Sequence, residues 1–266
     1  PNKPVRVIVP YAPGGVADAV ARMVNDKFAT ELGQSFITDN RGGGDGVIGM
    51  GAVVKSPPDG YTLAIDTSGY LINHWLRPGL PFNVLTEVAP ISILTRGDFL
   101  LVAHPSVPAN NLKELISYAK ANPGKLNAWS GASIQIVTYQ MFMNATGTKL
   151  TVVSYKAAAQ GFTDMLAGLV DVNMSNVGSS APHIKAGKLK GIAFAGPRRS
   201  PVLPDVPTFT EAGMSNFDAY NWIALLAPGK TPRDIIAKMN LQARKVLEAP
   251  EIVGALTNRD LEPNYT

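Results

Sequence analysis

The sequence predicts an α/β fold made of two doubly wound α/β domains around a ligand cleft. Strand and helix patterns alternate almost throughout the 266 residues, which favours parallel sheets with helices on both faces. The opening unit consists of a strand, a glycine-rich turn and a helix, and the same order of elements recurs beyond residue 100. A chain of this length with 45% hydrophobic residues can form two modest cores. Helix N-termini at the carboxyl edges of two facing sheets would line the cleft.

The first unit shows the pattern most clearly. Residues 5–9 form a short apolar run, typical of a strand buried on both faces, and Pro10 and Pro13 end it. Gly14 and Gly15 allow the backbone of a tight turn to approach another group closely. A helix follows, because apolar residues recur at helical spacing and Gly33 fits its C-terminal cap. The residues at that spacing are Ala17, Val20, Ala21, Val24 and Phe28.

The rest of the chain continues the alternation, with proline and glycine turns between elements. Helices are predicted at residues 47–56, 112–121, 134–145, 160–169, 182–186 and 232–247. Strands are predicted at residues 35–39, 61–67, 89–95, 99–103, 126–130, 150–155, 170–175, 191–195 and 219–226. We expect the chain to cross between domains near residues 100 and 226. Residues 1–100 plus 226–266 would then form the first lobe, and residues 101–225 the second.

The turn at Gly14 and Gly15 is a candidate anion-binding site. It aims unpaired N–H groups and the positive end of a helix outward, which suits a carboxylate or phosphate without any charged side chain. A plain connector between strand and helix is the open alternative. The turn at Gly131 repeats the arrangement before the helix at residues 134–145. Asp18, the third helical residue, either stabilises the helix dipole or contacts a ligand hydroxyl or amine.

Four aromatic residues fall in or near these loops: Tyr11, Tyr70, Trp129 and Tyr139. Each could belong to the core of its domain, or it could form the floor beneath the apolar body of a ligand. The pattern leaves both roles open.

Composition argues against several classes of function. The net charge of +4 comes from scattered basic residues, and no basic helix carries interleaved aromatics, so we expect no nucleic-acid partner. The chain has no cysteine, and His74, His104 and His183 are scattered, so we expect no metal site and no cofactor. No G-x-S-x-G motif is present, and we expect no catalytic residues. No apolar run reaches the ~18 residues of a membrane span.

An enzyme is the alternative interpretation. Gly44-Asp45-Gly46-Val47-Ile48-Gly49 matches the G-x-G-x-x-G pattern, and Asp66 follows at about the distance at which dinucleotide-binding folds place their ribose acid. Residues 40–43 nevertheless separate this motif from its strand, whereas the fingerprint turn follows its strand directly. A NAD-dependent oxidoreductase that uses residues 44–49 is therefore the weaker hypothesis.

A series of short motifs runs through the chain in order: Pro10-Tyr-Ala-Pro-Gly-Gly15 with Asp18, Asn40-Arg41 with the glycine run, Pro58-Asp-Gly-Tyr-Thr-Leu63, Pro105-Ser-Val-Pro108, Pro123-Gly-Lys-Leu-Asn127, His183-Ile-Lys-Ala-Gly-Lys-Leu189, and Leu203-Pro-Asp-Val-Pro-Thr208 followed by Glu211-Ala-Gly213. Together they resemble the Bug-type extracytoplasmic solute receptors, which are the substrate-binding proteins of tripartite tricarboxylate transporters. The resemblance spans essentially the whole chain.

This resemblance implies a periplasmic binding protein, not an enzyme, whose two α/β domains close like a Venus flytrap. It further implies a monomer that captures a small organic carboxylate through backbone amides and ordered waters, and that delivers it to the membrane subunits of the transporter. The motif matches and the residues singled out above give the expected ligand-binding set: Tyr11, Pro13, Gly14, Gly15, Val16, Asp18, Thr67, Ser68, Gly69, Trp129, Ser130, Gly131, Ala132, Ser133, Ile134, Ala157 and Asn176.

The second loop departs from the family pattern. After Ser130-Gly131 the family usually continues Asn-Gly-Ser/Thr and then a histidine, whereas this chain lacks the histidine and has Ile134, Ile136 and Val137. Such a lining loses hydrogen-bonding capacity and gains apolar contact. The sequence therefore predicts a carboxylate with an apolar or aromatic body.

Overall fold

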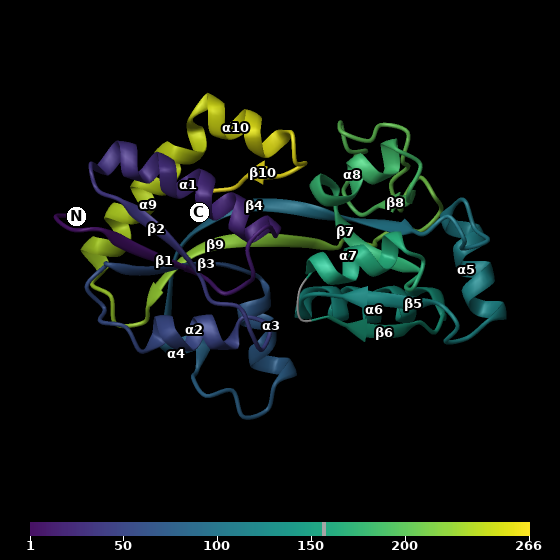
Figure 1. Ribbon diagram of the computed structural model, residues 1–266, viewed down its shortest axis with the longest axis horizontal. Coiled ribbons are helices and arrows are strands. Elements are labelled where there is room, and N and C mark those ends of the chain that lie inside the picture. Colours follow the sequence, from purple (N-terminus) through teal and green to yellow (C-terminus); the bar gives the residue numbers. More distant parts are fainter. Residues whose placement is uncertain (156–157) are drawn as a thin grey trace. The chain divides into compact units, whose positions relative to one another are not determined.

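The opening segment forms the strand, turn and helix that its pattern predicts. The structure, a computed structural model, describes residues 1–155 and 158–266 (Figure 1). Strand β1 covers Val5–Val9 and helix α1 covers Val16–Leu32. The five apolar residues at helical spacing in α1 are all buried, and Gly33 ends the helix in the left-handed conformation at a φ of 65°. Apolar spacing, together with the prolines and glycines between the elements, was therefore sufficient to predict this unit.

Contacts between residues divide the chain into two units. Unit 1 comprises Pro1–Arg96, Trp222–Thr257 and Leu261–Thr266. Unit 2 comprises Gly97–Asn221 and Asn258–Asp260. Strands β4 and β9 contribute residues to both units, and they cover Val88–Ala103 and Tyr220–Pro228. The lobes predicted from the sequence, as parts that close on a ligand, stay a prediction.

The sheet of unit 1 has parallel strands in its middle. Strand β1 pairs in parallel with β2 (Phe36–Asn40) on one side and with β3 (Thr62–Thr67) on the other. Strand β9 extends the sheet by pairing antiparallel with β3, and β10 (Glu262–Pro263) pairs antiparallel with β4. Because β1, β2 and β3 are parallel, their carboxyl ends lie at one edge of the sheet.

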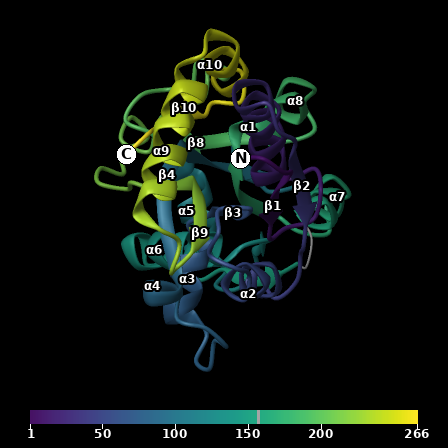
Figure 2. The same cartoon turned by 90° about the vertical axis from the view of Figure 1, so that its left-hand side faces the viewer.

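Helices cover both faces of this sheet. Helix α1 packs beside α9 (Arg233–Glu248) and α10 (Pro250–Thr257) on one face, and Figure 2 shows α1 and α9 side by side. The other face carries α2 (Val47–Val54), α3 (Gly69–Leu76) and α4 (Val84–Glu87), as Figure 1 shows. Strand β3 is buried on both faces, although it contains Thr62, Asp66 and Thr67.

Unit 2 repeats the same plan. Its parallel pairs join β5 (Asn127–Ser130) to β6 (Thr151–Ser154) and to β7 (Val172–Asn176). Strand β4 pairs antiparallel with β7 and with β8 (Lys190–Phe194). One core contains residues of α5 (Leu112–Ala121) and α6 (Ser133–Thr146). The other core contains residues of α7 (Ala158–Leu166) and α8 (Val177–Lys185).

The structure corrects the prediction of parallel sheets. Both units are mixed, because β4 and β9 run antiparallel to the strands they pair with. The two strands predicted at residues 89–95 and 99–103 are also one continuous strand, β4. Arg96 pairs with Glu262 and Phe99 pairs with Asn176, so the strand continues through the segment between the two predicted ranges.

Helix boundaries differ in several places. Helix α8 starts at Val177 rather than at Pro182, and Pro182 lies inside the helix. Helix α7 ends at Leu166, three residues before the predicted end, and α3, α4 and α10 were not predicted. Helix α3 begins at Gly69. Because glycine has a low helix propensity, tertiary packing overrides local propensity at this position.

Candidate functional site

Three helices of unit 1 begin just after the carboxyl ends of its parallel strands. Strand β1 leads through residues 10–15 into α1, β2 leads through residues 41–46 into α2, and β3 leads through Ser68 into α3. The register of β1 with β2 and β3 brings these three connections to one edge of the sheet. This edge is where open α/β sheets bind ligands.

The loop before α1 is held by the carboxylate of Asp18. Its Oδ2 accepts the Gly14 N–H at 3.0 Å and the Arg22 Nε–H at 3.1 Å, and its Oδ1 accepts an amide hydrogen of Asn40 at 2.9 Å. Asp18 is only 4% exposed, and these hydrogen bonds hold the pKa of its carboxyl below the usual range although burial opposes this. In this conformation Asp18 positions the loop, and its predicted ligand contact stays a prediction.

Asn40, at the end of β2, fastens the same loop a second time. Its side-chain amide also donates to the Tyr11 carbonyl at 3.1 Å, and its Oδ1 accepts from Arg22 at 3.1 Å. The Asn40 side chain thus joins three residues of the loop and helix α1, and it lies 18 to 29 positions away from them in the sequence. Motif spacing within a single segment could not identify this residue as a loop anchor.

The turn leaves amide groups unused. Gly14 donates to Asp18, so it is not a free donor, but within the residues that the structure describes the N–H groups of Gly15, Val16 and Ala17 have no hydrogen-bond partner. They begin a helix of 17 residues, whose positive end favours an anion. Arg22 offsets the charge of Asp18 by an ion pair at 3.1 Å. The turn can therefore accept a carboxylate.

Tyr11 and Thr67 connect this loop to the start of α3. The Tyr11 hydroxyl and the Thr67 hydroxyl share a hydrogen bond of 2.8 Å, and Thr67 Oγ1 also accepts the Gly69 N–H at 3.2 Å. Ser68 precedes Gly69, and its backbone N–H donates to Trp222. The structure thus brings together the predicted residues of the first loop and the predicted residues after β3.

Asp66 is an acid that the receptor interpretation did not use. It lies beside Thr67 in β3, is completely buried, and accepts the Thr67 N–H on Oδ1 at 2.6 Å. Burial raises the pKa of Asp66 to about 7, the Thr67 N–H and the Tyr11 phenol oppose the rise, and the charge of Asp45 adds to it. Burial raises the pKa of Tyr11 well above its usual value, and the charges of Asp66 and Asp45 add to this rise. Tyr11 therefore stays a neutral phenol.

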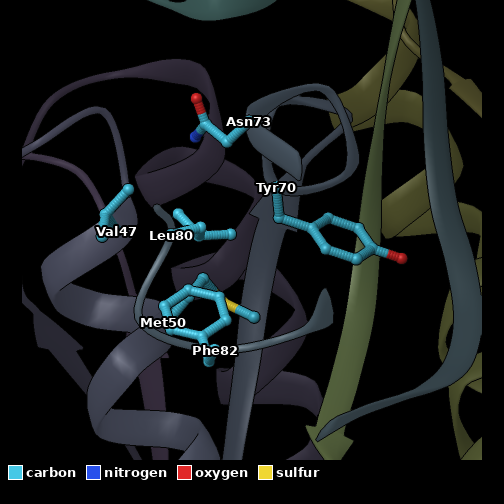
Figure 3. A pocket seen from close by; sticks show the side chains of 7 residues that line it. Val47, Met50, Tyr70, Asn73, Leu80 and Phe82 are labelled. Atoms are coloured by element: carbon cyan, nitrogen blue, oxygen red, sulfur yellow. The ribbon is translucent and has the colours of Figure 1, made fainter. Parts of the chain in front are cut away.

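A small apolar pocket lies beside this edge and is too tight for a ligand. Its lining residues include Val47, Met50, Leu80 and Phe82, and it has no room for a water molecule. Figure 3 shows that the hydroxyl of Tyr70 points away from these apolar side chains. The ring of Tyr70 instead meets Trp222 edge to face, with 5.8 Å between ring centroids. We interpret the pocket as a packing feature between α2 and α3.

Unit 2 carries a loop of the same design before α6. The Gly131 N–H donates to Oε1 of Gln135 at 2.8 Å, as the Gly14 N–H donates to Asp18. In both loops the acceptor is the third residue of the helix and follows the glycine by four positions. Gln135 also donates to the Met174 carbonyl at 2.8 Å, which ties the loop to β7. Asp18 and Gln135, the two residues that hold these loops, could therefore be identified from the sequence by their shared spacing from a turn glycine.

Trp129 belongs to the interior of unit 2. The residue is 2% exposed, its indole N–H donates to the sulfur of Met165 at 3.4 Å, and its ring meets Phe162 and Tyr155 edge to face. Gly161 permits this packing, because a Cβ there would lie 2.4 Å from the ring. In this conformation the side chain of Trp129 supports helix α7 rather than an open surface.

The other predicted residues of unit 2 surround the starts of two helices. Ser130 donates to the Ala132 carbonyl at 2.9 Å, Ser133 begins α6, and Asn176 precedes α8. Ile134 is half-buried and packs against the core of the unit. Ala157 lies outside the residues that the structure describes. The structure thus places Ser130 and Asn176 at the carboxyl ends of the parallel strands β5 and β7, and Ser133 shortly after β5.

The glycine motif at residues 44–49 has a structural explanation. Gly44 and Gly46 take left-handed conformations, with φ values of 59° and 88°. Gly49 packs directly on Pro10, where a Cβ would lie 2.6 Å from the proline Cβ. These glycines let α2 approach the end of β1, and this accounts for the pattern without a nucleotide.

Among the residues that the structure describes, no group of His, Cys, Asp and Glu side chains is arranged to hold a metal ion. Within the same residues, no helix is long and apolar enough to cross a membrane.

Comparison with known proteins identifies close relatives. Residues 20–266 match the tripartite tricarboxylate transporter family receptor. The protein BugT of Bordetella pertussis is 33% identical, and the match covers 99% of this chain and 82% of BugT. A solved structure described as a periplasmic transporter is 35% identical with a TM-score of 0.93, over 99% of this chain and 89% of that one.

Two further solved structures contain ligands. Rpa4515 of R. palustris, solved with adipate, is 31% identical with a TM-score of 0.93, and the match covers 99% of this chain and 89% of that one. MatC of Rhodopseudomonas palustris, solved with bound malate, is 29% identical with a TM-score of 0.91, and the match covers 99% of this chain and 90% of that one.

Proposed function

Because this chain belongs to the tripartite tricarboxylate transporter receptor family, we propose that it is a periplasmic receptor for a small organic carboxylate. The single observation that best supports a carboxylate as the ligand is the set of unused N–H groups at Gly15, Val16 and Ala17, at the positive end of α1. The relatives solved with adipate and malate support this ligand class, since both molecules carry carboxylates.

The family assignment confirms the Bug-type resemblance and the periplasmic-binding-protein-like fold. The chain is a receptor rather than an enzyme, so the oxidoreductase alternative at residues 44–49 is set aside. Delivery of the ligand to membrane subunits of a transporter follows from the family description and is part of our proposal. A monomer is the oligomeric state that we expect.

A thermal-shift panel tests the proposed function. The panel contains mono- and dicarboxylic acids, among them adipate, malate and phenylacetate, together with the amide of each acid and with NAD. We expect at least one acid to raise the melting temperature, because a ligand that binds only the native state stabilises it by mass action. The matching amide should not do so. A shift with NAD and with no acid would contradict the proposal.

We further propose that the ligand has an apolar or aromatic body. Val16 and Ile134 are half-buried at the two loops, and Ile136 is 38% exposed near the start of α6. A ligand that buries about 80 Å² more apolar surface than malate gains about 2 kcal/mol, or roughly thirtyfold in affinity. We therefore expect phenylacetate or adipate to bind more tightly than malate in calorimetric titrations. Tighter binding of malate than of both would disprove this preference.

Two glycines at opposite ends of α1 provide a matched test of the first loop. Gly14 and Gly33 both have positive φ values, of 90° and 65°, and a Cβ on either would meet no atom within 4 Å. Gly14→Ala and Gly33→Ala should each cost about 1 kcal/mol in backbone strain. Only Gly14→Ala should weaken binding of the acid identified by the panel, because only Gly14 shapes the turn. Equal affinities of the two variants, measured by calorimetry, would argue against the loop assignment.

A further inference from the structure

Asp66 is a buried acid that no cation compensates. The residue is completely buried, and its Oδ2 has no hydrogen-bond partner within the described part of the chain. No lysine, arginine or histidine among those residues forms an ion pair with it or contributes to its pKa. An ionised carboxylate is very costly to bury without a partner, and a protonated carboxyl costs far less.

The titratable groups that face Asp66 come from two loops and from α3, and none of them is a cation. Tyr11 faces it from the loop after β1, Asp45 from the loop before α2, and Tyr70 from α3. On β9 its register partner is Ala224. Helix α2 consists of residues without titratable side chains. Ionised Asp66 would therefore meet dipoles, apolar groups and the like charge of Asp45.

The same corner holds the predicted ligand loop. Tyr11 bonds to Thr67, the residue that follows Asp66, and Thr67 accepts the N–H of Gly69. The Tyr11 carbonyl accepts from Asn40, which also holds Asp18. A charge that appears at Asp66 would act on these bonds directly and on the loop through them.

We propose that Asp66 is a pH-sensitive positioning residue of the ligand loop, which carries a proton in the neutral range and opposes the binding of an anion when it ionises. The proposal rests on the proposed function, since it requires an anionic ligand at the turn before α1. The raised pKa of Asp66, about 7, agrees with the geometry.

Thermodynamic linkage gives the direction of the effect. An anion at the turn adds a like charge near Asp66 and so favours its protonated form. Ligand binding is then accompanied by uptake of a proton at Asp66 once the solution pH exceeds the pKa that Asp66 has in the ligand-free protein. The affinity should fall as pH rises above about 7, by up to tenfold per pH unit, and should be insensitive to Asp66 below that point.

The experiment combines infrared spectra with calorimetry on wild type, Asp66→Asn and the control Asp26→Asn, which changes an exposed acid on α1. We expect a protonated-carboxyl stretching band in wild type and in Asp26→Asn at pH 6 that is lost by pH 9 and absent from Asp66→Asn. Titrations with adipate, malate and phenylacetate at pH 6, 7, 8 and 9 should show weakening above pH 7 in wild type and none in Asp66→Asn. Tyr11→Phe, which keeps the acid but removes the phenol, should keep the band and bind with a reduced pH dependence.

Two results would overturn the inference. One is the absence of the band in wild type at pH 6, which would mean that Asp66 is ionised throughout. The other is the same pH dependence of affinity in wild type and Asp66→Asn, which would mean that the acid does not act on the loop. If none of the three acids binds at any pH, the proposed function fails and the positioning role fails with it, and this outcome is distinct from a pH-independent affinity.

Discussion

Replacing Gly49 with alanine is expected to lower the free energy of unfolding by about 3 kcal/mol, the upper range for overpacking a core. A Cβ at this position would lie 2.6 Å from the Cβ of Pro10 and 2.8 Å from the Arg41 carbonyl oxygen. None of these atoms is the far end of a flexible side chain that could turn aside, so α2 would have to move away from the end of β1. The displacement would also disturb the loop before α1, and we expect weaker ligand binding.

Gly51→Ala is the matched control for Gly49→Ala, since it lies in the same helix. A Cβ at Gly51 would meet the ring of Phe82 at 3.6 Å, which is an ordinary contact. Alanine is the better helix former by about 1 kcal/mol, so Gly51→Ala should be neutral or slightly stabilising. Urea denaturation of both variants tests the pair. Similar losses of stability in the two would show that close packing on Pro10 is not the reason for glycine at position 49.

Asp66→Asn is expected to raise the free energy of unfolding at pH 8 by about 2–4 kcal/mol. The carboxyl pKa rises from 3.8 to about 7 in the native state, and each unit corresponds to about 1.4 kcal/mol. A raised pKa in an acid means that the native state binds the proton more tightly than the unfolded state. Wild type should therefore lose stability as pH rises from about 4 to about 7, and the loss should be complete above that range.

The pH profile separates this effect from a general change in packing. At about pH 4 the carboxyl is protonated in the native state and still close to half protonated in the unfolded state of wild type, so Asp66→Asn and wild type should differ little there. Their difference should grow toward pH 7 and then stay constant. Urea denaturation at several pH values measures it, with Asp26→Asn as a surface control. A difference between wild type and Asp66→Asn that is constant across the whole range would contradict the assignment.

Local pattern predicted most of the fold because most of its information is local. The spacing of apolar residues predicted α1, and Gly33 marked its end. The antiparallel direction of β9 and the continuity of β4 depend on partners far away in the sequence. No local pattern contains those partners, and this explains the errors in sheet direction and in β4.

The candidate site shows the same division. The glycine turns before α1 and α6 were visible in the sequence, and the residues that anchor them share one spacing, from Gly14 to Asp18 and from Gly131 to Gln135. Asn40 and Asp66 could not be identified in this way, because their roles depend on side chains brought together by the sheet. Trp129 could not be assigned either, since an aromatic residue near a loop can serve the core or a ligand.

Calorimetric titration with an acid and its own amide tests the central claim most directly. The two molecules have nearly the same shape, and only the acid presents a carboxylate to the N–H groups of Gly15, Val16 and Ala17. A carboxylate held by charge-assisted hydrogen bonds should bind with a stoichiometry of about one, and its amide should bind at least tenfold more weakly. Equal binding of acid and amide, or binding of none of the acids tested, would contradict the account of this chain as a carboxylate receptor.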